Sequence, residues 1–408
     1  MHFTQGMELP LKGLKIIDFA TVIAAPVTAR IFADLGADVI KVENVGGGDY
    51  IMRIQTKGTP IIPEEHPLFA YSNSNKRFVS LDLKKPEGYA VMMKLLEDSD
   101  VLISNVRYKS LENLHMDYET IHARFPKLIY GHFSGYGYNG PDADIAAFDA
   151  SAFWGKSGAM KDWVPDGNQL PNASYGFGDF ASAMTFFGAI MTALYKRKEN
   201  GKGTMVAVSL QQNGLWMHNT NVIAAQERYH HSFPEDMDQF MVTSSLFRTK
   251  DKKWFMSLVH MRLDWEGFCR AVGMPHLPED PRFRDLDTVE KLGTMPELHR
   301  IMEKRFLEHT REEWLRIFEK AGLISGSVLS SEEAGRDQNA WDNEYLQMVK
   351  YMNGAEILMP AIPMQFSEYG VRPIGCSRPV GYNTDEVLKE HGYTEEEITK
   401  LRENKAAQ

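Results

Sequence analysis

The aspartate at position 179 stands where a carboxylate is able to do chemistry. It follows Gly178 and directly precedes a long apolar segment whose pattern predicts a helix from about Phe180 to Lys198. An aspartate at a helix N-cap commonly does no more than accept hydrogen bonds from the unpaired backbone N–H groups of the first turn. The same position also favours an ionised carboxylate and fixes its direction, and Phe177 and Phe180 add apolar surface around it. Asp179 is therefore a candidate for either a helix cap or a nucleophile.

Polar and cationic residues also stand at the ends of two predicted strands. Asn73–Arg77 precede the strand that begins at Phe78, and Asn105–Lys109 follow the strand that begins at Val101. For any one of these residues, a solvated loop end is the simpler interpretation. Ligands of parallel α/β sheets nevertheless bind outside the strand carboxyl ends, and cations there suit a phosphorylated ligand. Both segments are therefore candidates for a binding site.

The common cofactor and metal motifs are missing. The turn from Thr21 to Pro26 contains no glycine, whereas a dinucleotide site needs G-x-G-x-x-G so that the backbone approaches the pyrophosphate. Glu43 ends the second predicted strand, where a ribose-binding acid would stand, but it lacks those glycines. The sequence has no G-x-x-x-x-G-K-[ST] and no H-E-x-x-H, and its 13 histidines show no metal-ligand spacing. We expect neither a bound dinucleotide nor a bound metal ion.

The segments that must position these residues alternate between strand and helix. Helices are predicted from Pro26 to Gly36, from Pro86, and over 117–125, with proline in the first turn and glycine at the end where those residues are favoured. Because the crossover between successive strands is right-handed, the strands are parallel. The fold class is therefore α/β with a doubly wound parallel sheet. Short apolar runs bounded by turns predict its strands at 15–20, 37–43, 78–83, 101–104, 128–133 and 204–210.

The pattern changes twice further along the chain. Residues 134–178 are irregular and rich in glycine, proline, aspartate and aromatic residues, which is typical of a functional segment. From about 225 to 330, short strands are followed by helices, one of them opened by the capping box Thr310–Glu313. The sequence therefore predicts three parts: a large domain over 1–224, a small α+β domain over 225–330, and a C-terminal segment over 331–408 that returns to the large domain.

The composition is that of a globular protein. The 408 residues carry 45 Lys and Arg against 55 Asp and Glu, and the formal net charge of −10 argues against a binder of nucleic acid or of anionic membranes. Cys269 and Cys376 are too few for a disulfide framework. The N-terminus lacks the apolar stretch of a secretory signal, and no apolar run approaches the ~20 residues that span a bilayer. We expect a cytoplasmic protein.

A series of short stretches, in order along nearly the whole chain, forms one further pattern. It comprises Leu14–Phe19 with Ala24–Pro26, Gly36–Glu43, Asn75–Arg77, Leu81–Leu83, Ala90–Leu96, Ser99–Leu102, Asn105, Gly135–Gly137 with Gly140-Pro141, Phe148-Asp149, Gly178-Asp179, Gly201–Gly203 and Thr384–Leu401. This pattern resembles the family III CoA-transferases, the CaiB/BaiF family. Within that family it is most similar to the 2-hydroxyacyl-CoA transferases of amino-acid-fermenting anaerobes, which act on phenyllactate or 2-hydroxyisocaproate.

The resemblance implies a Rossmann-like large domain, a smaller domain inserted late, and two copies interlocked as a homodimer. It implies transfer of CoA from an acyl-CoA co-substrate to a small carboxylic acid, without a metal, a redox group or a permanently bound cofactor. It assigns Asp179 as the nucleophile, which forms a mixed anhydride and then an aspartyl-CoA thioester. The CoA-binding positions that it indicates are Val22, Ile23, Ala24, Asn75, Lys76, Asn105, Val106 and Arg107.

Some positions depart from the pattern of the relatives. Asn44, Asn113 and Ala146 stand where relatives carry CoA-contacting arginines or a lysine, so we expect Lys76 and Arg107 to hold the CoA phosphates. Phe180 replaces the usual serine or histidine after the aspartate, Ala183 replaces a glycine, and no glycine-rich loop stands between Phe240 and Lys253. These changes favour an aryl or branched-chain 2-hydroxy acid, or its enoate, over formate or oxalate. We expect an apolar acyl pocket formed by Phe177, Phe180, Phe153, Trp154, Met160 and Trp163.

Two alternatives stay open. A 2-methylacyl-CoA racemase needs two acid–base groups on opposite sides of the substrate, typically a histidine upstream of the aspartate. No histidine stands between Ser134 and Gly178, which argues against a racemase. The other alternative is a non-catalytic paralogue that only binds CoA, and the retained Asp179 argues against it.

Overall fold

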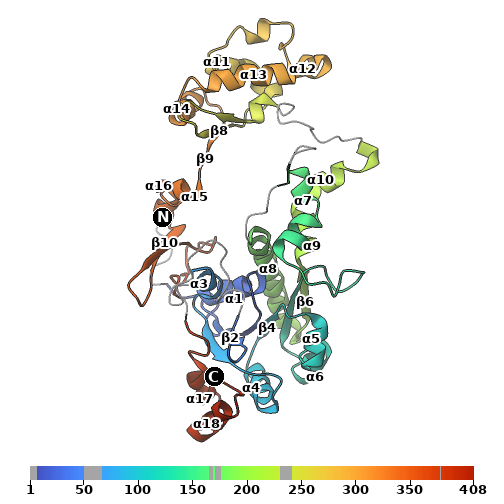
Figure 1. The fold of residues 1–408 in the computed structure, drawn as a ribbon, viewed down its shortest axis with the longest axis vertical. Coiled ribbons are helices and arrows are strands. Elements are labelled where there is room, and N and C mark those ends of the chain that lie inside the picture. The colour runs from blue at the N-terminus through green and yellow to red at the C-terminus, as the bar shows by residue number, and fades with distance from the viewer. Residues whose placement is uncertain (1–6, 50–66, 165–168, 171–175, 230–240, 377) are drawn as a thin grey trace. The chain divides into compact units, whose positions relative to one another are not determined.

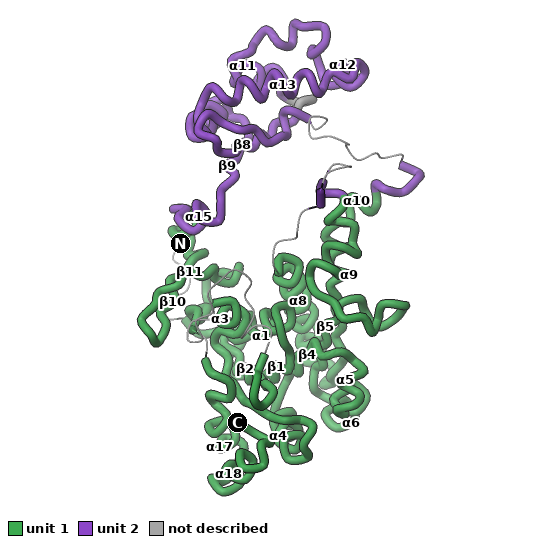
Figure 2. The backbone as a smooth tube through the Cα atoms, in the orientation of Figure 1, with its two compact units in different colours: residues 1–161, 171–223, 339–408 green, residues 162–170, 224–338 purple. Residues whose placement is uncertain are grey.

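The structure is a computed structural model that describes residues 7–49, 67–164, 169–170, 176–229, 241–376 and 378–408. The chain divides into two compact units, coloured separately in Figure 2. The large unit comprises residues 1–161, 171–223 and 339–408, and the small unit comprises residues 162–170 and 224–338.

A six-stranded parallel sheet forms the centre of the large unit (Figure 1). Its order is β3-β2-β1-β4-β5-β6, so the chain winds outward from β1 in one direction and then, from β4, in the other. This is the doubly wound arrangement that the alternating pattern predicts. The strands are β1 (Lys15–Phe19), β2 (Asp38–Glu43), β3 (Arg77–Ser80), β4 (Val101–Ser104), β5 (Ile129–Ser134) and β6 (Met205–Ser209).

Helices cover both faces of the sheet, because alternate strand residues point to opposite faces and both sets are apolar. On one face, Phe32 of α1 (Ala24–Asp34) and Phe186 of α8 (Phe177–Asn200) pack on sheet residues such as Ile103. The helices of the other face share a second core with Leu102. They are α4 (Pro86–Glu97), α5 (Tyr108–Asn113), α6 (Tyr118–Arg124), α17 (Thr384–Glu390) and α18 (Glu395–Glu403).

The rest of the large unit consists of short elements around this sheet. They are α3 (Pro67–Asn73), the single-turn helix η1 (Ala150–Gly155), α7 (Ala159–Asp162), α9 (Leu210–Met217), α10 (Asn219–Ala224), and the antiparallel pair β10 (Leu346–Lys350) and β11 (Glu356–Pro360). The helix α16 (Gln338–Asp342) lies where the chain passes from the small unit to the large one.

The small unit combines a three-stranded antiparallel sheet with helices. Phe247 and Phe306 stack at 4.2 Å between ring centroids in its separate core, which also buries Trp314 completely. The predicted capping box opens α14 (Arg311–Lys320): Thr310 accepts from the Glu313 backbone, and the Glu313 side chain accepts from the Thr310 backbone. The other elements are β7 (Leu246–Arg248), β8 (Trp254–Ser257), β9 (Ser325–Val328), α11 (Met261–Ala271), α12 (Leu286–Leu292), α13 (Met295–Phe306) and α15 (Ser331–Ala334).

Helix α8 differs from its prediction at the end that carries Asp179. It begins at Phe177, three residues earlier than expected, and its N-cap is Gly176, whose φ of 74° lies in the left-handed region. Asp179 is the third residue of the first turn, so the interpretation of Asp179 as the N-cap is wrong. Glycine tolerates this backbone conformation without the steric cost that other residues meet.

The same helix is long and apolar enough to cross a membrane by length and composition alone, although no apolar run of that length stood out in the sequence. Phe186, Ile190 and Leu194 pack in the core beneath the sheet, which explains the apolar character of this helix. Such a match is weak evidence for a membrane span, because the core helix of a globular protein passes the same test.

Candidate active site

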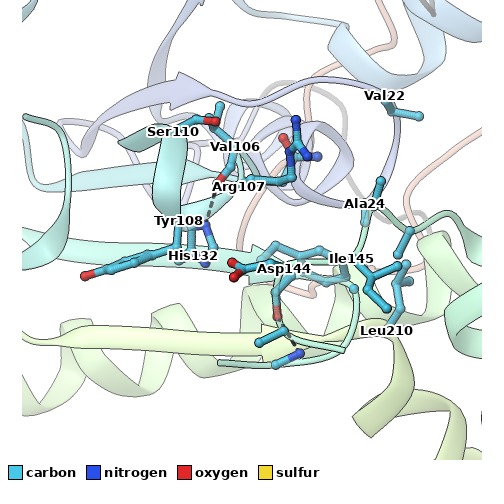
Figure 3. A pocket seen from close by; sticks show the side chains of 18 of the residues that line it. Val22, Ala24, Val106, Arg107, Tyr108, Ser110, His132, Asp144, Ile145 and Leu210 are labelled. Atoms are coloured by element: carbon cyan, nitrogen blue, oxygen red, sulfur yellow. Dashed lines mark hydrogen bonds between the residues drawn. The ribbon is translucent and has the colours of Figure 1, made fainter. Parts of the chain in front are cut away.

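A cavity of about 930 Å³ lies at the carboxyl ends of β1, β4 and β5. The strand order reverses between β1 and β4, and ligands of doubly wound sheets bind at that point. Figure 3 shows Val22 and Ala24 on one side of the cavity, Tyr108 and His132 on the other, and Arg107 between them. Seven of the nine site residues predicted from the sequence line this cavity: Val22, Ile23, Ala24, Asn105, Val106, Arg107 and Asp179.

Asp179 is a buried carboxylate in the cavity wall. Its side chain is 9% exposed, and α8 presents it from its first turn. Burial raises the pKa of Asp179 to about 7, with a further contribution from the nearby Asp149 carboxyl. The partial positive charge of a helix N-terminus has the opposite effect, but it contributes only about 0.3–1 kcal/mol. Removal from water therefore dominates, and Asp179 is far more basic than an ordinary aspartate.

The side chain of Asp149 lies against Gly178 at the start of α8, and sequence reasoning missed it as a site residue. Burial raises its pKa to about 6, while the backbone N–H groups of Gly178, Gly176 and Asp179 and the indole of Trp154 favour its ionised form. The motif Phe148-Asp149 supports the family resemblance, but no local signal in the irregular segment assigns this aspartate to a helix that begins far along the chain.

Gly178 allows the Asp149 carboxyl group to lie close to the start of α8. A Cβ atom at Gly178 would lie 2.2 Å from Oδ1 of Asp149 and 2.3 Å from Cγ of Phe153. Real Cβ atoms do not occur at such distances, so a larger residue would displace either the carboxyl group or the ring. The two carboxyl groups and the glycine thus form one structural unit at the helix start.

Asn105 holds the turn that follows β1. Its Oδ1 accepts from the Thr21 N–H at 2.9 Å, and its Nδ2 donates to the Thr21 carbonyl at 2.7 Å. Both hydrogen-bonding groups of Thr21 are thus bound by one side chain from the end of β4. Asn105 therefore fixes the position of the neighbouring cavity residues Val22 and Ile23.

Lys76 lies outside the lining of this cavity. Its ammonium group is buried within hydrogen-bond distance of four oxygen atoms: Asp18 Oδ2 at 2.7 Å, the Pro26 carbonyl at 2.8 Å, Asn73 Oδ1 at 2.8 Å and the Ser72 carbonyl at 3.1 Å. Burial lowers the pKa of Lys76 to about 7, against the opposing effect of Asp18.

Asn75 also lies outside the cavity lining. Its Nδ2 donates to Oδ1 of Asp34 at 2.7 Å and to the Pro373 carbonyl at 2.9 Å. Asn75 and Lys76 precede β3, so they enter the sheet at the amino edge, whereas the cavity lies at the carboxyl edge. Both residues support α1 from outside the cavity.

His132 forms the opposite wall together with two tyrosines. Its Nε2 lies 2.7 Å from the Val106 carbonyl, and the Tyr138 hydroxyl contacts its Nδ1. This pattern assigns the proton to Nε2, with Tyr138 donating to Nδ1. Burial lowers the pKa of His132, so the ring is neutral at neutral pH. Because both ring nitrogens have partners, His132 holds the Val106 backbone in place. Sequence reasoning missed this role, which depends on a partner 26 positions away in the chain.

The cavity contains cations for a phosphorylated ligand. Arg107 and Lys109 line it from the segment that follows β4, and both are exposed. Ala146 also lines the cavity. A second cavity of about 180 Å³ shares Thr21 and Val106 with the first and includes Asn44 and Lys84.

The residues expected to form the acyl pocket lie outside the cavity lining. Phe153 and Trp154 belong to the core, Phe177 packs on Trp154 at 5.6 Å between ring centroids, and Phe180 meets Tyr71 edge-on at 5.4 Å. None of the six predicted pocket residues is part of the cavity lining. Other apolar side chains line it: Ile23, Phe133, Ile145, Phe148 and Leu210.

No group of three or more histidine, cysteine, aspartate or glutamate side chains is arranged to hold a metal ion in the part of the chain that the structure describes.

Known proteins match this chain over nearly its full length. A family model described as CoA-transferase family III matches residues 11–380. Cinnamoyl-CoA:phenyllactate CoA-transferase of Clostridium sporogenes is 34% identical over 400 residues, which cover 96% of this chain and 96% of that protein. (R)-2-hydroxy-4-methylpentanoate CoA-transferase of Clostridioides difficile is 31% identical over 399 residues, which cover 97% and 98%.

A solved structure matches the fold of this chain over a similar share of its length. The crystal structure of a CAIB/BAIF family protein from Brucella suis superimposes with a TM-score of 0.81 at 22% sequence identity, covering 94% of this chain and 100% of that one. The similarity therefore includes both units and is not confined to the parallel sheet.

Proposed function

Because the chain belongs to CoA-transferase family III, an enzyme family, we propose that it moves CoA from an acyl-CoA thioester to a free carboxylate with Asp179 as the covalent carrier. The acceptor is an aryl or branched-chain 2-hydroxy acid or the corresponding enoate. This substrate class rests on the names of the two relatives, one acting on phenyllactate and the other on 2-hydroxy-4-methylpentanoate.

The observation that carries the proposal is the buried Asp179 carboxylate in the wall of the large cavity. A carboxylate is a weak nucleophile in water, where it is strongly solvated. Burial removes that solvation and raises the pKa of Asp179 to about 7, so its ionised form is more basic and more reactive. An oriented attack contributes a further ~7–11 kcal/mol relative to a bimolecular encounter.

The chemistry consists of two halves. Asp179 attacks the thioester carbonyl of the donor, the C–S bond breaks, and a mixed anhydride and CoA thiolate form. The thiolate attacks the aspartyl carbonyl of the anhydride, which releases the donor carboxylate and leaves an aspartyl-CoA thioester. The acceptor carboxylate then attacks this thioester, and the thiolate takes the acceptor acyl group from the second anhydride. Because the anhydrides react with water, the burial of Asp179 also protects them.

The cavity provides positions for both ends of an acyl-CoA. Arg107 and Lys109 are the cations for its phosphates, and the turn Val22–Ala24 with Val106 forms the walls along its length. Ile23, Phe133 and Phe148 provide apolar surface in the same cavity as Asp179, which suits a phenyl or isobutyl group.

A racemase would need a second acid–base group near Asp179. Among the described residues that line the cavity, His132 is the only histidine, and both of its ring nitrogens are engaged by Val106 and Tyr138. This arrangement argues against a racemase that uses a histidine as its second acid–base group.

We also propose the interlocked homodimer that the family resemblance implies. The exposed apolar side chains of α9 and α10 support it, since Trp216, Met217 and Ile223 are 72%, 55% and 51% exposed in the single chain. Sedimentation of the purified protein tests this state.

The experiment that tests the function follows both CoA and oxygen. The protein is incubated with cinnamoyl-CoA and phenyllactate labelled with ¹⁸O in its carboxylate, and CoA exchange is read by mass spectrometry. The mechanism transfers one acceptor oxygen to the Asp179 side chain, so the peptide that contains Asp179 gains ¹⁸O. Exchange without label in that peptide rejects the aspartyl anhydride, and absence of exchange over a panel of acids supports a non-catalytic paralogue.

A further inference from the structure

The turn between β1 and α1 contains a backbone conformation that glycine commonly adopts, but the residue there is a valine. Val22 adopts a φ of 69°, in the left-handed region. A β-branched residue is a true outlier there, because its side chain collides with its own backbone. Such a conformation persists only where the surrounding structure enforces it.

Side chains from neighbouring strands and from the segments that follow them hydrogen-bond to consecutive residues of this turn. The Val22 N–H donates to Oδ2 of Asp49 at 2.8 Å. Lys41, at the centre of β2, donates to the Ala20 carbonyl at 2.7 Å, and the Asn105 amide binds both backbone groups of Thr21. The backbone of the whole turn is therefore held by residues that follow or belong to other strands.

Asp49 is fixed in this position by its own contacts. Its side chain is 1% exposed, and the Lys41 ammonium group lies 3.9 Å from its Oδ2. Its backbone N–H donates to Oε1 of Glu43 at 3.1 Å. Asp49 does not line the main cavity, although it lines the smaller neighbouring one. Its negative charge makes it unsuited to contact a phosphate, so its role concerns the turn.

The same turn also contacts the start of the helix that carries Asp179. Val22, Ile23 and Ala24 line the main cavity, and Cδ1 of Ile23 lies 2.9 Å from the position of a Cβ built on Gly176. Gly176 is the N-cap of α8, three residues before Asp179. A shift of the turn would therefore move the cavity wall and also remove the support beneath the nucleophile.

We propose that Asp49 is a positioning residue of the transfer reaction, because its hydrogen bond to the Val22 N–H keeps the β1–α1 turn in the left-handed conformation that places Ile23 against the start of α8. The kinetic test of this inference rests on the proposed function, because it measures CoA exchange. It differs from a general structural role because it predicts that the importance of Asp49 depends on the residue at position 22.

The test is the Asp49→Ala substitution in three backgrounds: the unmodified chain, Val22→Gly and Val22→Ala. In the unmodified chain, Asp49→Ala lowers kcat/KM for CoA exchange by about tenfold or more, because small displacements of reacting groups have effects of that size. In the Val22→Gly background the same substitution lowers kcat/KM by less than about threefold, since glycine adopts this φ without strain. Val22→Ala is the matched control, because it truncates the side chain as well but keeps a Cβ, and it should not rescue.

An equal loss in all three backgrounds, or no loss in the unmodified chain, overturns the proposal. If Asp49→Ala does not fold, Asp49→Asn replaces it. Its side-chain carbonyl still accepts from Val22, so it lowers kcat/KM by less than about threefold in every background, and a larger loss that does not depend on position 22 also overturns the proposal.

Amide hydrogen exchange over residues 21–24 provides a readout that needs no activity. Asp49→Ala speeds exchange in this segment if the hydrogen bond holds the turn, and unchanged exchange contradicts the proposal. If the unmodified protein shows no transfer activity but Asp49→Ala still speeds amide exchange, only the proposed function is rejected. The role of Asp49 in holding the turn then stands.

Discussion

The carboxyl group of Asp149 raises the pKa of the Asp179 carboxyl, adding to the larger effect of burial. Asp149 lies against Gly178, the residue before Asp179, and only glycine allows Asp149 to approach the backbone so closely. The N–H groups of the first helical turn favour the ionised form of Asp149. The two carboxyl groups therefore differ in position: Asp149 lies against the start of the helix, and Asp179 lines the cavity.

Replacing Asp179 should abolish transfer without unfolding the protein. Asp179 is not the N-cap of α8, and its pKa is raised to about 7 from 3.8. Its ionised form therefore destabilises the folded state, by an amount that is absent at acidic pH and fully present above about pH 7. We expect Asp179→Asn to lose all measurable exchange and to melt at an equal or higher temperature than the unmodified protein at pH 8, with a smaller difference at pH 5. Exchange retained by folded Asp179→Asn would contradict the covalent mechanism.

Replacing Asp149 should change the pH profile more than the fold. Since Asp179 attacks in its ionised form, kcat/KM falls as the pH decreases through about 7. Asp149→Asn keeps the size of the side chain but removes the negative charge, so the pKa of Asp179 decreases and activity persists to lower pH. We expect the acidic limb to move to lower pH, by less than the whole shift because burial is the larger cause. An acidic limb that stays in place would show that Asp149 does not influence the nucleophile.

Gly178→Ala tests the close approach of Asp149 directly. The added methyl group meets Oδ1 of Asp149 and the Phe153 ring at distances below 2.5 Å, so the start of α8 must shift. We expect kcat to decrease by about a hundredfold, the size of effect that misplaced reacting groups produce. Gly188→Ala on the same helix is the matched control, since no atom lies within 4 Å of its added Cβ, and it should stabilise the protein by about 0.4–1 kcal/mol. Equal kinetics for the two variants would show that the carboxyl group is not constrained.

The fold could be predicted from the sequence further than the site could. The sheet followed from local signals, because strands such as Val101–Ser104 are apolar runs between clear turns. Asp179 was recognised from its position before an apolar helix and from the family pattern. Lys76 illustrates what local signals cannot provide: its partner Asp18 lies 58 positions away, so a buried ion pair and a phosphate-binding lysine are identical in sequence. Asp149 was missed for the same reason, since its role arises only where two distant segments meet.

Arg107 and Lys76 should respond differently to removal of their charges. Arg107 is exposed in the cavity, so Arg107→Ala should raise KM for acyl-CoA without a change in melting temperature, by the loss of a charge-assisted hydrogen bond of about 1.5–3 kcal/mol. Lys76 pairs with Asp18 in the interior, and breaking a buried pair destabilises by about 3–5 kcal/mol. Lys76→Ala should therefore lower the melting temperature and leave KM of the folded fraction nearly unchanged. A selective increase of KM in Lys76→Ala would return this lysine to the cofactor site.

The acyl group should be selected by the apolar part of the cavity. Phe148 lines the cavity and is 58% exposed, so a bound phenyl or isobutyl group would cover it. Burial of such a group contributes about 1.5–3 kcal/mol, which predicts a preference of roughly ten- to a hundredfold in kcat/KM for phenyllactate or 2-hydroxy-4-methylpentanoate over acetate and oxalate.

Phe148→Ala should remove much of this preference while leaving the rate with acetate nearly unchanged, because acetate is too small to reach the ring. The measurement compares kcat/KM for the four acids with one acyl-CoA donor held fixed, in the unmodified protein and in Phe148→Ala. A preference for acetate or oxalate, or an equal loss for all four acids in Phe148→Ala, would mean that the acyl group binds away from this side chain.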